Sequence, residues 1–177
     1  ANIVDSRTNQ KLFPPHHIIE NDGISIGIIG LTNLIPSHTD KVKVEDFITV
    51  GKAQIDELRN KVDLVVVLAN VNRDKNEEMN EEFSDADYIF VSRNTTRTRP
   101  GTEQPLQGPF TYGSNIQGKY LAQIDINLTK VDSPLVDVSS MHTQIDNIDK
   151  RLERFQNKDP KKSMEDIYAD QPRIIKL

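Results

Sequence analysis

The sequence contains neither cysteine nor tryptophan among its 177 residues. The absence of cysteine excludes a disulfide scaffold, a zinc–thiolate site, an iron–sulfur cluster and a cysteine nucleophile. Long apolar runs are missing as well: the longest, residues 24–31 and 64–69, fall far short of the roughly 20 residues that a membrane-spanning helix needs. We therefore predict that the chain has no membrane span.

The charge balance is acidic, with a formal net charge of −5 at pH 7, and gives no support to nucleic-acid binding. Apolar residues make up only 36% of the chain, which allows a core with little to spare. The sequence opens on Ala1, without an initiator methionine and without the basic and then apolar pattern of a signal peptide. This opening suggests a processed product or a fragment.

Strand and helix patterns alternate through the first half of the chain. Residues 17–20 and 24–31 predict a β-hairpin around the tight-turn sequence Asn21-Asp22-Gly23. Strands are then expected at residues 63–69 and 86–91, and helices at 44–61 and 77–83. This order favours an α/β unit with right-handed crossovers. Residues 110–114 and 120–128 predict two further strands, joined by a turn through Gly118.

The composition changes after Leu128, and Ser133-Pro134 indicates a linker. Residues 139–156 predict an amphipathic helix because Ile145, Ile148, Leu152 and Phe155 recur at spacings of three and four. Ser139 or Ser140 is its candidate cap, and Ser163 is the candidate cap of a short last helix. We thus expect one domain at residues 1–130 and a helical extension at 131–177. The apolar stripe of the long helix could pack on its own domain or on another chain.

Polar residues that could carry chemistry lie at the carboxyl ends of the expected parallel strands, where open α/β sheets bind ligands. These positions are Thr32-Asn33, residues 69–74 and residues 92–97, and they offer amides, hydroxyls and guanidinium groups. They lack the carboxylate and imidazole cluster that divalent metals prefer. His16 and His17 are neighbours on a strand, so their side chains should point to opposite faces and chelate one metal poorly.

The order and spacing of several segments resemble a calcineurin-like metallophosphoesterase of the 5'-nucleotidase branch. The matching segments are residues 1–3, 12–15, 23–32, 62–68, 86–90, 112–114 and 118–121. The resemblance covers residues 1–128, and it corresponds only to the second half of that family's catalytic domain. It implies an α/β fold: the second half of a metallophosphoesterase-like β-sandwich flanked by helices, with a helical C-terminal extension.

The family uses two divalent metals, and the resemblance implies that their ligands are not retained here. An Asp-His pair, a bridging Asp and an Asn-His pair would lie upstream of Ala1. Asn70 stands where the family has a metal-binding histidine, and Arg93 and Thr95 replace the histidines of a Gly-His-x-His turn. Arginine cannot ligate a cation, because it is permanently protonated. No catalytic residue, metal ligand or cofactor is therefore assigned to this chain.

Three functions stay open at this point. The first is a non-catalytic structural or interaction subunit, a pseudoenzyme with a degenerate active site within a larger assembly. The second is part of a metal-dependent 5'-nucleotidase-like phosphohydrolase that upstream sequence or a partner completes. The third is a phosphate or nucleotide binder without turnover, in which Asn70, Arg93, Thr95 and Arg97 would contact the anion.

A half-sandwich would expose one apolar sheet face and an unpaired edge. We therefore expect a missing N-terminal half, a protein partner or a second copy to complete the sheet. The resemblance also favours an exported or periplasmic protein, because nucleotidases of this family are commonly exported.

Overall fold

The computed structural model describes residues 1–36, 39–92, 97–106, 108–128, 133–159 and 161–170. The chain forms two compact units, which are described separately. The first comprises residues 1–99 and 104–137, and the second comprises residues 100–103 and the chain from residue 138 onward. The expected boundary between residues 130 and 131 lies outside the described residues and stays a prediction.

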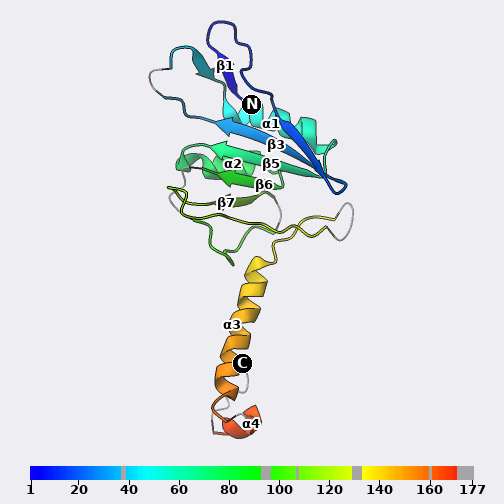
Figure 1. Cartoon of the computed structure of the whole chain (residues 1–177), viewed down its shortest axis with the longest axis vertical. Coiled ribbons are helices and arrows are strands. Elements are labelled where there is room, and N and C mark those ends of the chain that lie inside the picture. Colours follow the sequence, from blue (N-terminus) through cyan, green and yellow to red (C-terminus); the bar gives the residue numbers. More distant parts are fainter. Residues whose placement is uncertain (37–38, 93–96, 107, 129–132, 160, 171–177) are drawn as a thin grey trace. The chain divides into compact units, whose positions relative to one another are not determined.

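A five-stranded mixed sheet with the order β2-β3-β5-β6-β7 forms the centre of the first unit (Figure 1). Its strands are β2 (His17–Asn21), β3 (Ile24–Thr32), β5 (Leu64–Asn70), β6 (Tyr88–Val91) and β7 (Phe110–Gly113). Strand β2 pairs antiparallel with β3, and every other neighbouring pair is parallel. Asp22 (φ 51°) and Gly23 (φ 81°) turn the predicted β2–β3 hairpin in the left-handed region that such a turn requires. The predicted α/β class is confirmed.

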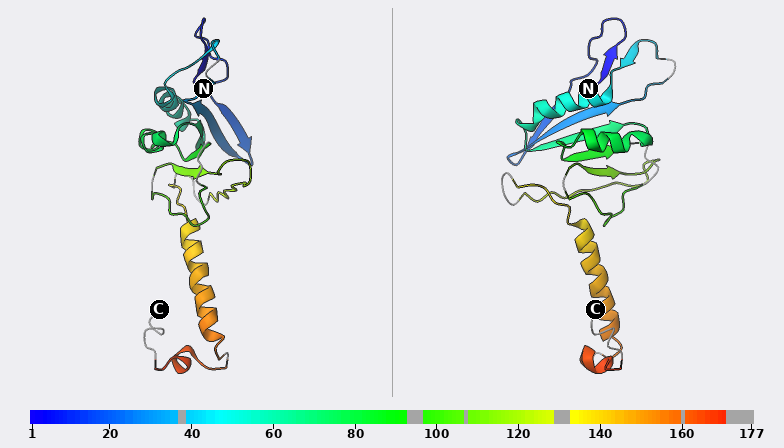
Figure 2. Two further views of the ribbon diagram at one scale, coloured as in Figure 1. Left: turned by 90° about the vertical axis from the view of Figure 1, so that its left-hand side faces the viewer. Right: turned by 180° about the vertical axis from the view of Figure 1, so that it is seen from behind.

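Helices cover one face of this sheet (Figure 2). They are α1 (Phe47–Arg59) and α2 (Asn76–Glu82), the latter preceded by the 3₁₀ turn η1 (Arg73–Lys75). The Asp46 carboxylate caps α1 by accepting a 2.8 Å hydrogen bond from the Thr49 amide. Leu58 of α1 and Phe83 after α2 are completely buried. The main core therefore lies between this face and its helices.

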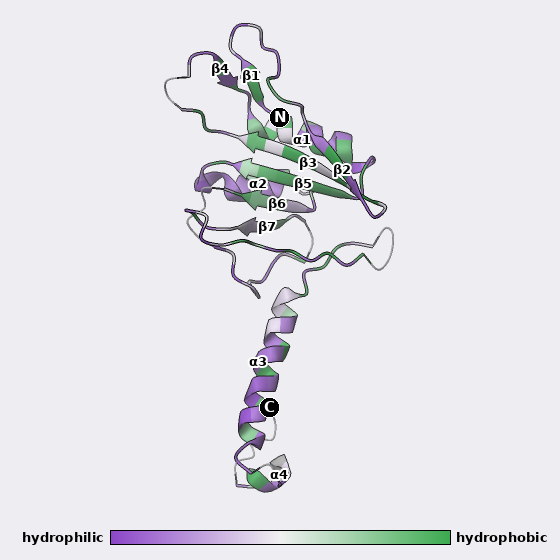
Figure 3. Cartoon of the chain, in the orientation of Figure 1, coloured by the Kyte–Doolittle hydropathy of each residue, from purple (hydrophilic) through white to green (hydrophobic). Residues whose placement is uncertain are grey.

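The opposite face of the sheet is apolar, and neither helix covers it. We define the open face by residues that point away from the helices on four adjacent strands: Ile19, Ile26, Ile28, Gly30, Val66, Leu68 and Phe90. Leu68 stays 46% exposed and Ile19 43% exposed, whereas Ile26, Ile28, Val66 and Phe90 are half-buried. Figure 3 shows the hydrophobic colouring of β3 and β5 in this part of the sheet. Towards β7, the ring of Phe90 stacks on those of Tyr88 and Tyr112.

A second, two-stranded sheet was not predicted from the sequence. Strand β1 (Ile3–Asp5) pairs antiparallel with β4 (Val42–Val44). The buried Asn2 side chain ties this sheet to β3, since its amide donates to the carbonyls of Thr32 (2.6 Å) and Glu45 (2.9 Å). Its side-chain oxygen also accepts from the Thr32 amide at 3.1 Å. These bonds fix the carboxyl end of β3.

The predicted strand at residues 120–128 is wrong, because these residues form no strand in the structure. Three of its alternating apolar side chains are exposed, with Tyr120 at 47%, Leu128 at 40% and Ile126 at 37%. A strand needs a neighbouring backbone to pair with, and no described strand pairs with this segment. Alternation of apolar and polar residues alone therefore did not make this segment a strand.

The second unit contains α3 (Ser139–Gln156) and α4 (Met164–Ile167). The predicted bounds of the long helix are confirmed, but Val138 occupies its N-cap position and makes no side-chain cap bond, so the proposed serine caps are wrong. The cap of the short helix is confirmed, because Ser163 Oγ accepts from the Asp166 amide at 3.1 Å. Phe155 packs edge-on against Tyr168, with ring centroids 5.5 Å apart.

Candidate functional site

The carboxyl ends of β3 and β5 meet in a network of uncharged polar groups. Thr32 Oγ donates to the carbonyl of Asn70, and the amide of Leu34 donates back to Thr32 Oγ at 3.1 Å. The Asn33 amide donates to the same Asn70 carbonyl, and Asn33 Oδ1 accepts from the Asn72 amide at 3.2 Å. The parallel pairing of β3 and β5 brings these residues together, as the sequence analysis expected. Their hydrogen-bonding groups mostly bind the backbone of the neighbouring strand end.

Asn70, which the sequence resemblance places at a histidine position, is the last residue of β5. Its side-chain oxygen Oδ1 is buried, and no donor among the described residues reaches it. A buried acceptor without a donor is unusual in a folded protein. The oxygen is neutral, so it supplies neither the negative charge of a carboxylate nor the nitrogen of an imidazole.

Arg97 lies between β6 and β7 in the sequence and forms a β-bridge with Ser114. Its guanidinium lies over the Tyr120 ring, 4.2 Å from the centroid. This cation–π contact engages the flat face of the guanidinium but leaves its edge able to donate hydrogen bonds. Arg93 and Thr95 lie outside the described residues, so the grouping of the four predicted anion contacts stays a prediction.

The donor set at the described ends of β3 and β5 does not fit a two-metal centre. Among the described residues, no group of three or more histidine, aspartate or glutamate side chains could hold a metal ion. Divalent transition metals in hydrolytic sites are bound by imidazole and carboxylate groups, whereas these strand ends present amides and hydroxyls. Thr32, Asn33, Asn70 and Asn72 thus give the metal pair that the resemblance implies no anionic or imidazole ligand.

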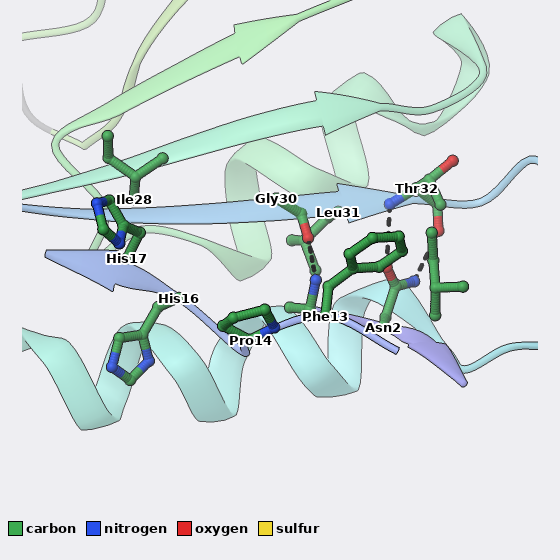
Figure 4. Close-up of a pocket in the computed structure, with 11 residues that line it drawn as sticks. Asn2, Phe13, Pro14, His16, His17, Ile28, Gly30, Leu31 and Thr32 are labelled. Atoms are coloured by element: carbon green, nitrogen blue, oxygen red, sulfur yellow. Dashed lines mark hydrogen bonds between the residues drawn. The ribbon is translucent and has the colours of Figure 1, made fainter. Parts of the chain in front are cut away.

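An open pocket of about 500 Å³ lies beside β3, next to the open face. Phe13, Pro14, His17, Ile28 and Gly30 line much of it (Figure 4). His16 turns towards α1 instead, where its Nδ1 lies 2.8 Å from Gln54 Oε1. The two adjacent histidines therefore diverge, as their strand position predicted. This geometry supports packing and hydrogen bonding over joint metal chelation.

The aromatic end of the sheet carries the most strongly perturbed ionisable groups. Burial, helped by the nearby Asp87 and Asp137 carboxylates, raises the pKa of Tyr88 to about 12. Burial also raises the pKa of Tyr112, whose hydroxyl donates to Asp137 at 3.3 Å. Both shifts favour the neutral phenol, so these side chains act as packing groups near neutral pH.

Sequence comparison relates part of the chain to a nucleotidase. An 86-residue stretch is 33% identical to a 5'-nucleotidase of Vibrio cholerae. The stretch covers 44% of this chain but only 16% of the Vibrio protein, so the chain spans a small part of this curated relative's length. No family model matches the sequence. The chain is thus distantly related to 5'-nucleotidases over part of its length.

Two solved structures share the fold of part of the chain. One is a sulfate thiohydrolase, SoxB, of Thermus thermophilus in complex with glycerol, with a TM-score of 0.53 and 18% identity over 64% of this chain and 22% of that protein. The other is a putative 5'-nucleotidase of Staphylococcus aureus in complex with α-ketoglutarate, with a TM-score of 0.51 and 15% identity over 63% of this chain and 26% of that protein. At these identities the likeness concerns the fold alone.

Proposed function

We propose that this chain is a non-catalytic, phosphoesterase-derived structural layer within a larger 5'-nucleotidase-like assembly. The observation that carries the proposal is the chemistry of the strand ends. Thr32, Asn33, Asn70 and Asn72 occupy the edge where an α/β hydrolase would bind its metals. Their side chains are neutral, and those of Thr32 and Asn33 bind backbone groups. Hydrolysis by two metals depends on a metal-bound hydroxide and a clamp on the phosphoryl oxygens. This edge offers ligands suited to neither task.

The open face gives this layer a role. Exposed apolar area of this kind marks a surface that packs against something else. The finer assignment that we propose is the second half of a metallophosphoesterase-like sandwich, whose other sheet comes from upstream sequence or a partner. Leu68 and Phe90, paired across β5 and β6, lie on the surface that would receive that sheet. The chain would then stabilise and position the other sheet, and it would take no part in bond cleavage.

A second candidate is a hydrolase completed by other sequence. The 33% identity to the Vibrio 5'-nucleotidase favours it, and the unsatisfied Asn70 Oδ1 lies where such a site would be built. In that case the missing part would have to supply ligands at the positions of Asn70, Arg93 and Thr95. The two candidates differ in whether Asn70 affects turnover.

The variant Asn70→Ala separates the two candidates. It is produced in the natural source and purified with whatever completes the chain still bound. The measurements are metal content by native mass spectrometry and release of phosphate from 5'-AMP with added Mn²⁺, Mg²⁺ or Zn²⁺. We expect background turnover and no bound metal pair in the wild type, unchanged by Asn70→Ala. Asn72→Ala is the matched control, because it removes a neighbouring amide from the same edge. Metal-dependent turnover that falls at least about tenfold in Asn70→Ala but not in Asn72→Ala would establish the hydrolase instead.

Leu68→Lys tests the role of the open face. A charge at the centre of the surface should prevent a second layer from packing there, because a buried unpaired ammonium is costly. We expect the variant to leave the larger assembly while keeping the helix content of the wild type. Leu121→Lys serves as the control, since Leu121 is 94% exposed and lies outside the open face. Full retention of Leu68→Lys in the assembly would contradict the layer hypothesis.

A further inference from the structure

Helix α3 is long and amphipathic, and the second unit leaves its apolar side chains exposed. Four of its apolar side chains, Met141, Ile145, Ile148 and Leu152, are between 42% and 54% exposed, and none of its residues is buried. A helix of 18 residues is marginally stable by itself in water, so most helices of this length depend on a packed apolar face. The exposed apolar stripe of α3 therefore needs a surface to pack against.

The spacing of the stripe specifies the shape of that surface. Met141, Ile145, Ile148, Leu152 and Phe155 follow one another at steps of four, three, four and three. This alternation is the a/d pattern of a heptad repeat, whose mean period of 3.5 residues keeps a narrow seam facing a second helix. A helix lying on a sheet usually presents a broader apolar face. The flanks of this seam are polar, so its width fits another helix.

Contacts within the second unit leave the seam open. Thr143 lies on the back of the helix, where its side chain packs so closely on Gly101 that a Cβ there would overlap it. Phe155 is engaged at the far end by Tyr168 and by the guanidinium of Arg151, 5.7 Å above its ring. The unit's own chain thus occupies the back and the C-terminal end of α3.

We propose that α3 pairs with α3 of a second copy of this chain, in antiparallel orientation, with Ile145 of one protomer opposite Ile148 of its partner. In this register Met141 faces Leu152, and the seams overlap over nearly the whole helix. The pair is self-complementary, as a two-fold symmetric dimer requires. Opposed helix dipoles also favour the antiparallel arrangement.

The flanking residues agree with this register. The positions beside the seam place His142 of one protomer next to Asp149 of the other, where an imidazole N–H can donate to a carboxylate. On the other flank, Gln144 lies next to Arg151 of the partner. No like charges face each other in these pairs, and charges at such positions set orientation in coiled coils.

Single cysteines test the pairing directly, because the chain has none of its own. Met141→Cys mixed with Leu152→Cys should give a mixed disulfide dimer in excess of either variant oxidised alone. In the antiparallel pair the two copies of residue 141 lie 11 helical residues apart, or about 16 Å, which is too far for a disulfide. Lys150→Cys, on the back of the helix, is the control and should form no disulfide-linked dimer under the same oxidation. Self-linked Met141→Cys and Leu152→Cys dimers would overturn the antiparallel pair.

Sedimentation equilibrium of the full chain supplies an independent measurement. Ile148→Asp should raise the dimer dissociation constant by at least about tenfold, whereas Lys150→Asp should leave it unchanged. Leu68→Lys should also leave it unchanged, because the open face is a separate surface, so this result does not depend on the proposed structural layer. A wild type that stays monomeric at every concentration would overturn the proposal. The proposal would also be overturned if Ile148→Asp lowered the unfolding midpoint equally at all protein concentrations and left the sedimentation mass unchanged.

Discussion

The two faces of the five-stranded sheet have similar compositions and different surroundings. Val67 and Leu68 are neighbours on β5, yet Val67 is completely buried beneath the helices and Leu68 is 46% exposed. Gly27 and Gly30 differ in the same way on β3: a Cβ at Gly27 would lie 2.9 Å from Leu58, whereas nothing lies within 4 Å of one at Gly30. The strands are thus apolar on both sides, but α1 and α2 cover only one. Stability should therefore depend on the helix-covered face, and the open face should be free to pack against a second layer.

The largest difference between the faces should come from deleting a leucine on each side. Leu58→Ala removes a completely buried side chain and should lower the free energy of unfolding by about 3 kcal/mol. Leu68→Ala removes the same atoms from the open face and should cost less than about 1 kcal/mol, because much of that side chain is already in water. Urea unfolding of the two variants and the wild type measures both changes. Equal losses would mean that the open face is covered in solution.

Two glycines make a second pair, with a smaller expected difference. A Cβ at Gly51 of α1 would overlap the ring of Phe83 and approach Leu31 Cδ1 to 2.9 Å. Gly51→Ala should therefore destabilise by about 2 kcal/mol through overpacking, even though alanine favours helix by up to about 1 kcal/mol. Gly30→Ala should change stability by no more than about 0.5 kcal/mol, because it meets open space.

Thermal unfolding of both glycine variants provides the test. A stable Gly51→Ala protein would mean that Phe83 has room to turn aside and that the helix-covered face is less tightly packed than the structure indicates. A destabilised Gly30→Ala protein would again indicate a second layer against the open face. The two glycine results thus examine opposite faces by the same chemical change.

The sequence predicted the elements well where local pattern and tertiary environment agree. The turn at Asp22-Gly23, the strand β5 and the helix α3 all have strong local signals, and the structure contains them. An apolar run such as β5 indicates burial on both faces, but it does not say whether the same chain supplies both covers. The segment 120–128 failed for a related reason, since its alternating pattern assumed a neighbouring strand that the described chain does not provide.

The candidate site was predictable only in its position. The parallel topology places the ends of β3 and β5 side by side. The sequence predicted that amides and hydroxyls lie there. The network from Asn33 to Asn72 and the ties of Asn2 to β3 and Glu45 depend on three-dimensional contacts between distant segments. No local spacing encodes these bonds, because their partners are 30, 39 and 43 residues apart. The stacking of Arg97 on Tyr120 was missed because it requires the loop conformation.

The smallest effect in this comparison concerns Tyr88, which stacks beside Phe90 at the aromatic end of the sheet. Burial raises its pKa to about 12 from the ordinary value of 10.0. Because the folded protein holds this proton more tightly than the unfolded chain does, the stabilisation is complete below pH 10 and is lost as the pH rises towards 12. A titration of tyrosine absorbance near 295 nm should therefore show Tyr88→Phe deleting a component that titrates near pH 12. The variant should also lose less stability than the wild type between pH 10 and pH 12, as measured by urea unfolding at each pH. If Tyr88→Phe instead removes a component that titrates near pH 10, water reaches this end of the sheet. Tight packing would then be limited to the helix-covered face.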